Sequence, residues 1–514
     1  MIQALRHADA YDHPVEAIEL VDTHISWVLL TGTYAYKVKK PVKFPFLDFS
    51  TRERRKKFCN EELRLNRRLA PSLYLGVVPI GGTVEDPKIG KLPAIEHAVK
   101  MRQFPSAALI DRKLATGGVT AEDFRAFAET LADFHAHLEP ASPDVQLGSA
   151  EIVIRTALSN FRELKGASAE RDLAALSSIG AWTETQCARL EKTFTRRKAS
   201  GAIRECHGDL HLKNLVHLDG RIVAFDALEF EPELRWMDVM SETAFLTMDL
   251  IAHDRNDLAH EFLSRYLECS GDYAGFDVLP FYLVYRALVR AKVAALGDWQ
   301  PRSTLGGSSY LRVAAQLSAR TGTPLLVIMH GLSGSGKSTV AERLIGILPA
   351  VRIRSDLERK RLFGFSSDAD TRSGVATGIY DANASARTYA VLGEYARLGI
   401  EAGFNIIVDA AFLRRAERDA FAGLAARTGA SFVALDCQCP ETVLRNRIAR
   451  RRAEREDPSE ATTDVLAHQL AHAEPLAPDE LSHAVTFATD QPVESTDLLR
   501  RIAAIAAKAA PTNA

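Results

Sequence analysis

Apolar positions in the first part of the chain follow two different periods. Residues 52–69 carry apolar side chains at spacings of three to four, which predicts a helix, and Phe124, Phe127, Leu131 and Phe134 predict a second amphipathic helix in the same way. Alternating or continuous apolar stretches predict strands, the first two joined by a turn at Gly32 and Thr33. These strands are expected at 24–32, 34–42, 75–82 and 94–101.

The second part of the chain alternates short apolar runs with helical stretches, which is typical of a parallel sheet wrapped by helices. Its strands are expected at 325–331, 351–355, 405–411, 431–437 and 484–489. Before them, residues 297–309 are rich in Gly, Ser and Pro and predict a loop, and 309–320 predict a helix. We therefore expect one domain over 1–320, a second, α/β domain over 324–505, and a tail over 506–514.

Composition restricts the class of protein. The 514 residues are 46% hydrophobic and 25% charged, which excludes a disordered or collagen-like chain. With 64 Lys+Arg against 66 Asp+Glu, the formal charge is −2, so any basic surface must be local. The 6 cysteines form no CxxC pair, so neither a zinc ribbon nor a disulfide framework is indicated. Without a membrane-length apolar run or a signal-peptide core, the chain is expected to be cytoplasmic.

The segment GLSGSGKS follows the expected strand at 325–331 and matches the phosphate-binding loop G-x-x-x-x-G-K-[ST]. Glycines let successive backbone N–H groups surround phosphate oxygens, and the following helix adds its positive dipole end. The lysine can reach the β- and γ-phosphates, and the serine hydroxyl is placed for Mg²⁺. The expected nucleotide-binding residues are Gly331, Ser333, Gly334, Ser335, Gly336, Lys337, Ser338 and Thr339.

Three further features follow the loop. Asp356 and Arg359 stand just after the second expected strand, Asp409 ends the third, and Arg447 and Arg451 lie four apart in an arginine-rich stretch. The segment with Asp356 resembles that of small P-loop kinases, including polynucleotide 5′-hydroxyl kinases and zeta-toxin-like kinases. The resemblance implies that Asp356 accepts the acceptor's proton, that Arg359 holds substrate, and that the arginines form a catalytic lid. Asp409 is a candidate Mg²⁺ carboxylate. Helix or turn capping for the two aspartates, and a solvated or nucleic-acid-facing helix for the arginines, remain alternatives.

A second group of polar residues stands in the first part of the chain. HGDLHLKN over 207–214 has the spacing of a kinase catalytic loop, with Asp209 to orient or deprotonate an acceptor hydroxyl and Asn214 to bind Mg²⁺. Asp226 ends the next expected strand, where a second metal-binding carboxylate is needed. This order of residues is similar to that of the aminoglycoside and choline phosphotransferase family, which implies a kinase-like α+β fold. Gly208 replaces the arginine common in protein kinases.

That resemblance also implies a lysine and a glutamate upstream. Lys37 in AYK is expected to bind the α- and β-phosphates and to pair with Glu62. Lys39 and Glu61 lie close enough in sequence to be the alternatives. Asp238 matches a family aspartate that braces the catalytic loop.

Taken together, the two halves resemble a bifunctional protein, an aminoglycoside-phosphotransferase-like domain fused to a zeta-toxin-like P-loop kinase domain. We expect each half to bind ATP and Mg²⁺ and to transfer the γ-phosphoryl group to a hydroxyl of a small molecule, a sugar nucleotide or a nucleic-acid end. One alternative is a regulatory protein with one ATP-binding pseudokinase half. Another is an ATPase that acts with nucleic acid.

Overall fold

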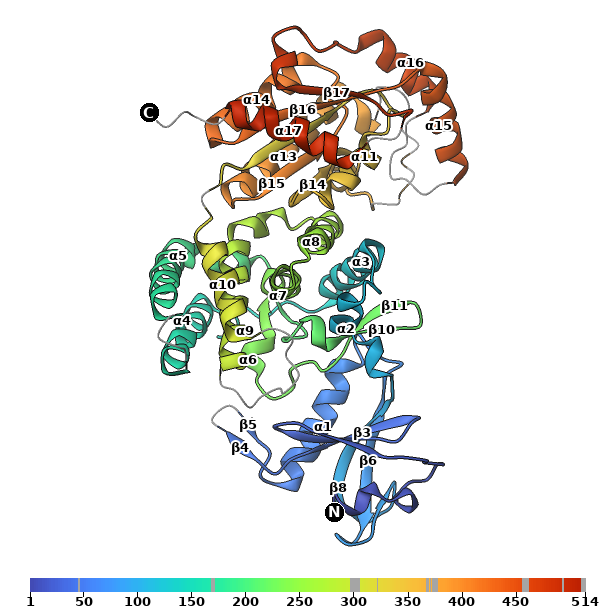
Figure 1. Ribbon diagram of the computed structural model, residues 1–514, viewed down its shortest axis with the longest axis vertical. Coiled ribbons are helices and arrows are strands. Elements are labelled where there is room, and N and C mark those ends of the chain that lie inside the picture. The colour runs from blue at the N-terminus through green and yellow to red at the C-terminus, as the bar shows by residue number, and fades with distance from the viewer. Residues whose placement is uncertain are drawn as a thin grey trace. The chain divides into compact units, whose positions relative to one another are not determined.

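The computed structural model describes most of the chain and divides it into two compact units. Unit 1 comprises Met1–Asp254 and Phe281–Ala319, and unit 2 comprises Arg255–Pro280 and Arg320–Ala514. Figure 1 gives the labels of the elements. The residues left undescribed are 45–46, 168–171, 296–305, 321, 367–368, 370, 372–377, 455–461, 492–493 and 510–514. Most of the loop expected at 297–309 and much of the expected tail therefore lie outside the described residues.

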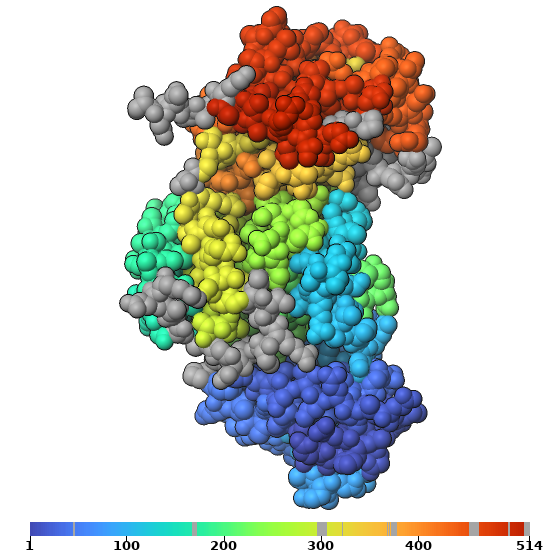
Figure 2. All heavy atoms as spheres, viewed as in Figure 1, coloured from blue at the N-terminus to red at the C-terminus, as the bar shows by residue number. Residues whose placement is uncertain are grey.

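Unit 1 begins with a six-stranded antiparallel sheet in the order β1-β2-β3-β8-β6-β7. Its strands are Glu19–Asp22, Ser26–Leu30, Tyr34–Lys39, Ala94–Arg102, Tyr74–Gly82 and Pro87–Ile89, in that order. Helix α1 (Arg52–Asn66) packs against β6 and β8, and begins where the Thr51 side chain accepts a hydrogen bond from Arg54 N–H. It ends three residues before the expected boundary. In the space-filling view of Figure 2, the residues at the start of the chain, in blue, gather into one lobe.

The rest of unit 1 is mainly helical. Its helices are α2 (Ile110–Ala115), α3 (Ala121–His137), α4 (Ala150–Ala167), α5 (Leu173–Ala199), α6 (Pro232–Arg235), α7 (Val239–Ala252), α9 (Leu279–Ala295) and α10 (Gly307–Ser318). Short strand pairs join β9 (Ile203–Glu205) to β12 (Trp236–Asp238), β10 (Leu215–Leu218) to β11 (Arg221–Ala224), and β4 (Lys43–Phe44) to β5 (Leu47–Asp48). The loop that joins β9 to β10 carries the HGDLHLKN segment.

Unit 2 contains a five-stranded parallel sheet in the order β14-β15-β13-β16-β17. Its strands are Ala350–Arg354, Asn405–Asp409, Leu325–His330, Ser431–Gln438 and Ala484–Ala488, in that order. The central strand β13 is buried along nearly its whole length, as its continuous apolar run requires in a sheet covered on both faces. Its helices are α8 (Asn256–Ser270), α11 (Lys337–Ile345), α12 (Ser355–Leu362), α13 (Ala382–Glu401), α14 (Arg415–Thr428), α15 (Glu441–Glu454), α16 (Thr463–His472) and α17 (Ser495–Ala509).

Residues 255–280 belong to unit 2, although they precede the expected boundary near 320. Glu268 on α8 is buried and accepts a hydrogen bond from Arg352 Nε at 2.8 Å, and the Ser264 hydroxyl accepts one from Arg352 N–H. In the following 3₁₀ turn, the Tyr273 ring stacks on Tyr395 of α13 with centroids 4.4 Å apart. Helix α8 therefore completes the packing around β14, and the second unit is not one continuous stretch of sequence.

Candidate active sites

Lys37 on β3 reaches two carboxylates of unit 1. Its Nζ lies 2.8 Å from Glu62 Oε1 and 2.5 Å from Asp226 Oδ1. Lys39, on the same face of the strand, also contacts Glu62, at 2.7 Å. Burial alone would raise the pKa of Glu62, but the two ammonium groups lower it to about 2. The structure thus places both candidate lysines on Glu62, while Glu61 binds Arg64 and Arg235 instead.

The loop with Asp209 is held by hydrogen bonds within itself. Asn214 Nδ2 donates to Asp209 Oδ2 at 2.9 Å and to the Asp209 carbonyl, which leaves the amide oxygen of Asn214 available as a ligand. His211 Nε2 lies 3.3 Å from the same carboxylate oxygen. Burial would raise the pKa of Asp209, but His211 and Arg290 hold it below its ordinary value. The carboxylate is therefore ionised at neutral pH and able to accept a proton or a hydrogen bond.

Two buried carboxylates of helix α7 fasten this loop, and neither was predicted from the sequence. Glu242 accepts hydrogen bonds from His207 N–H at 3.1 Å and Gly208 N–H at 2.7 Å, and it contacts His135 at 3.0 Å. Asp249 accepts one from Leu212 N–H at 2.9 Å. The expected brace, Asp238, instead pairs with Arg197 and caps the start of α7. The brace on the catalytic loop is thus supplied by the interior of α7 rather than by its cap.

Gly208 occupies the position where protein kinases commonly carry arginine, and its backbone explains the difference. It has φ 91°, in the left-handed region, where a side chain is strained. A Cβ there would also lie 3.1 Å from the Cβ atoms of Arg235 and Leu228.

We expect Glu242→Gln to loosen the catalytic loop without unfolding the unit. The neutral amide weakens two charge-assisted hydrogen bonds, so exchange of the His207 and Gly208 amide hydrogens should accelerate roughly 10- to 100-fold. The pKa of Glu242 is lowered to about 2. In the wild-type protein its contribution is therefore complete above about pH 4.5 and is lost as the pH falls toward 2. Hydrogen exchange measured across that range checks both statements, because the variant should lack the acid-dependent step.

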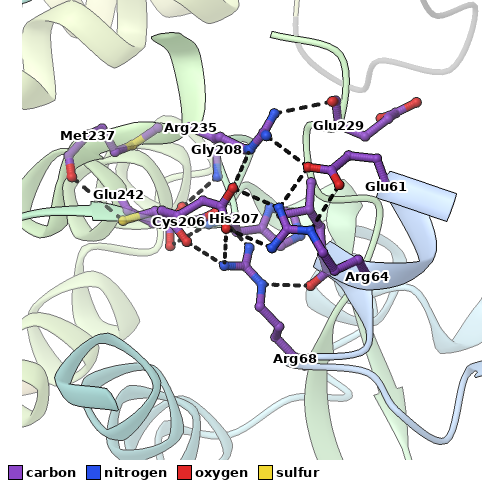
Figure 3. A network of polar contacts seen from close by, with 12 residues as sticks. Glu61, Arg64, Arg68, Cys206, His207, Gly208, Glu229, Arg235, Met237 and Glu242 are labelled. Carbon is purple, nitrogen blue, oxygen red and sulfur yellow. Dashed lines mark hydrogen bonds and ion pairs between the residues drawn. The ribbon is translucent and has the colours of Figure 1, made fainter. Parts of the chain in front are cut away.

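Arginine side chains join helix α1 to the residues just before the catalytic loop (Figure 3). Arg64 binds the Glu205 carboxylate through two nitrogen atoms, at 2.9 and 2.8 Å. Arg68 donates to the Glu205 and Cys206 carbonyls at 2.6 and 3.0 Å. Arg235 bridges Glu205 and Glu61. The helix that carries Glu62 and the loop that carries Asp209 are therefore held in one arrangement.

In unit 2 the phosphate-binding loop takes the shape that its glycines permit. Gly331, Gly334 and Gly336 have φ values of 140°, 83° and 83°. A Cβ at Gly331 would lie 2.6 Å from the Cys437 carbonyl oxygen, and one at Gly334 would lie 2.8 Å from the Leu444 carbonyl oxygen. The helix after the loop, α11, begins at Lys337, whose Nζ donates to the Leu332 carbonyl at 2.8 Å. Ser338 is half-buried in the first turn of that helix, and Thr339 beside it is exposed.

Acidic and basic groups converge on Lys337. Burial lowers the pKa of Lys337, and Arg451 lowers it further, whereas Asp409 and Asp356 raise it. The charges of these three side chains therefore act on its ammonium group. Asp409 ends β15, the strand beside β13, and its Oδ2 is buried without a hydrogen-bond partner. Arg354 Nε lies 3.8 Å from that oxygen. A buried carboxylate oxygen left open beside a phosphate-binding loop fits a hydrated Mg²⁺.

Two arginines singled out from the sequence are engaged with the protein itself. Arg447 donates to the Gly334 carbonyl at 3.3 Å and to the Thr489 carbonyl at 2.7 Å, so it fastens α15 to the phosphate-binding loop. Arg359 is buried and donates to the Ile379 carbonyl at 2.9 Å and to the Ser385 hydroxyl at 3.2 Å. Substrate contact by Arg359 and Arg447 stays a prediction.

Comparison with known proteins places the chain in a family. A family model described as an AAA domain matches residues 326–476. Uncharacterized protein Rv2004c of Mycobacterium tuberculosis is 31% identical over 463 residues, which cover 88% of this chain and 90% of that protein. Uncharacterized protein Mb2027c of Mycobacterium bovis gives the same values. The chain belongs to the family of these mycobacterial proteins.

Solved structures with partial likeness include kinases. An amicoumacin kinase aligns with a TM-score of 0.40 and 12% identity, covering 62% of this chain and 93% of its own. A sugar kinase from Janibacter sp. aligns with a TM-score of 0.26 and 23% identity, covering 37% of this chain and 97% of its own.

The expected α+β then α/β order of the fold is confirmed, because unit 1 combines an antiparallel sheet with helices and unit 2 has a parallel sheet in which residues 326–476 match the AAA domain. The phosphate-binding loop lies within the residues that match the AAA domain, and P-loop folds generally use ATP and a divalent metal. In the described part of the chain, no helix combines the length and apolarity needed to cross a membrane.

Proposed function

We propose that the protein is an ATP- and Mg²⁺-dependent phosphotransferase with two separate ATP sites, each of which transfers the γ-phosphoryl group to a hydroxyl. The observation that carries the proposal is the set of contacts in unit 1. Lys37 bridges Glu62 and Asp226, while Asn214 bonds the Asp209 carboxylate. A regulatory pseudokinase usually lacks one member of such a set, so its retention favours a working site.

In the first site, Lys37 would hold the α- and β-phosphates in place of its present contact with Asp226, and Glu62 would keep the lysine oriented. Asn214 Oδ1 and Asp226 are the residues that would hold Mg²⁺. Asp209 would accept a hydrogen bond, and then the proton, from the acceptor hydroxyl. Bound Mg·ATP supplies the phosphoryl group and neutralises charge that develops during transfer.

In the second site, the backbone N–H groups of residues 331–338 would surround the phosphates, and Lys337 would leave the Leu332 carbonyl to reach them. Ser338 and Asp409 are the candidate groups for Mg²⁺, the latter through water. Asp356 would take the acceptor's proton. Arg451, already near Lys337, is the better placed of the two candidate lid arginines to face the phosphates.

The acceptors we favour are hydroxyl-bearing small molecules. The near-neutral net charge of −2 argues against a long nucleic acid, although the arginine-rich helix α15 keeps a nucleic-acid end as the alternative for the second site.

The test follows the label from γ-³²P-ATP and Mg²⁺ into a cell extract divided into small-molecule and nucleic-acid fractions. Label in a small-molecule product supports the proposal, and label in nucleic acid redirects it to a polynucleotide end. Label only in free phosphate, or ATP binding that is tight and indifferent to Mg²⁺, would favour the ATPase or the regulatory alternative.

A further inference from the structure

Arg290 is a buried arginine of unit 1 that the proposed chemistry does not use. It lies on α9, is 6% exposed, and its guanidinium sits 5.5 Å from the centre of the Tyr310 ring. Its Nε is buried without a hydrogen-bond partner. Within the part of the chain that the structure describes, no carboxylate lies within ion-pair distance of it. A buried cation is costly unless it is paired with an anion, so this site calls for one.

The carboxylates near Arg290 are committed to other groups. Asp249 accepts hydrogen bonds from the Tyr310 hydroxyl at 2.7 Å and from Leu212 N–H at 2.9 Å. Asp209 is bonded by Asn214 and lies beside His211. Burial would lower the pKa of Arg290, but Tyr310 and the two carboxylates raise it, and neither carboxylate forms a direct pair with the guanidinium. The guanidinium thus retains donors for a ligand.

Arg290 lies next to the loop that carries Asp209. Its guanidinium faces the Tyr310 ring, the Tyr310 hydroxyl donates to Asp249, and Asp249 accepts a hydrogen bond from Leu212 N–H in that loop. With His211, Arg290 holds the pKa of Asp209 below its ordinary value despite burial. His211 is 1% exposed and its Nδ1 has no hydrogen-bond partner. One cationic side chain and one imidazole therefore lie near the carboxylate that would receive the acceptor's proton.

We propose that Arg290, with His211, forms an anion-binding subsite, so that the acceptor of the first site carries a carboxylate or phosphate group near its reacting hydroxyl. The inference rests on the proposed function for the identity of the acceptor, but the subsite itself does not. Arginine suits the role because its planar guanidinium binds carboxylate and phosphate oxygens through two donors.

The first test measures binding and needs no acceptor. Both nucleotide sites are filled with a non-hydrolysable ATP analogue and Mg²⁺, and binding of ³²P-orthophosphate is then measured by equilibrium dialysis. We expect Arg290→Gln to weaken phosphate binding about 10- to 100-fold, the effect of losing a charge-assisted hydrogen bond. Arg290→Lys should retain part of the affinity. Lys292→Gln, on the same helix and paired with Glu163 at 3.6 Å, should change nothing. The melting temperature and Mg·ATP binding of each variant establish that it is folded.

Absence of phosphate binding, binding that Arg290→Gln leaves unchanged, or an adventitious ion only, seen as equal loss in Lys292→Gln, overturns the proposal. The second test compares phosphoryl transfer to acceptors matched in skeleton but not in charge, glycerate with glycerol and gluconate with glucose. Preference for the anionic member that falls in Arg290→Gln supports the proposal. Preference for neutral or cationic acceptors overturns it while the proposed function stands. Arg290-dependent phosphate binding without transfer to any acceptor counts against the proposed function and leaves the subsite supported.

Discussion

Asp209→Asn should lower phosphoryl transfer by the first site about 10²- to 10⁴-fold, the range expected for loss of a general base. The native carboxylate is ionised at neutral pH because His211 and Arg290 lower its pKa despite burial. An asparagine of the same shape keeps the side chain in place but cannot take the acceptor's proton. Because Lys37, Glu62 and Asp226 are untouched, ATP affinity should change little. The measurement compares labelled product from the two proteins with Mg·ATP binding by the same samples.

The matched control is Asp133→Asn, since Asp133 is an exposed aspartate on α3 and should not matter. Unchanged product formation in Asp209→Asn, with the product traced to the first site, would remove the residue from the chemistry. Weakened ATP binding by that variant would instead indicate a role in holding the nucleotide.

Lys337→Ala should lower phosphoryl transfer by the second site roughly 10²- to 10³-fold, the effect of removing one donor that stabilises the transferring group. Burial and Arg451 already lower the pKa of this ammonium group, while Asp409 and Asp356 oppose the shift. The variant keeps the phosphate-binding loop but lacks the side chain that would bind the β- and γ-phosphates. The first site should keep its activity, so each variant should remove a different labelled product.

Arg500→Ala serves as the control for the second site, because Arg500 is exposed and pairs with Asp497 on its own helix, α17. If Lys337→Ala and Asp209→Asn abolish the same single product, the chain has one working site and the other is regulatory. If Lys337→Ala changes no product, the second unit binds nucleotide for another purpose.

Sequence patterns predicted the site residues that lie within one continuous segment. The phosphate-binding loop is one continuous segment between a buried strand and a helix, so its residues fix their own geometry. Lys37, Glu62 and Asp226 were placed by family spacing, and the fold brings them into contact. Glu61 and Glu62 look alike in sequence, and only the packing of α1 decides which one turns inward.

Residues that act from a distance could not be predicted. Glu242 and Asp249 are separated by 35 and 37 residues of sequence from their partners His207 and Leu212 in the catalytic loop. The apolar residues of their helix do not indicate that these two carboxylates face that loop. Arg290 is similar, because a charged residue in an amphipathic helix is normally expected on the solvent face. For α8, the hydrophobic face is evident in the sequence, but nothing in that face indicates which unit it covers.

The membership of α8 and the Tyr273 turn in unit 2 has a consequence for synthesis of the chain. The ribosome completes both before any strand of the parallel sheet exists, because β13 begins only at Leu325. Glu268 can therefore form its hydrogen bond with Arg352 only after the rest of unit 1 has been synthesised. A gene cut between 320 and 324 would leave this helix on the wrong polypeptide. The two halves therefore cannot be exchanged between proteins by a cut at that junction. A recombinant protein that keeps unit 2 intact must also contain α8.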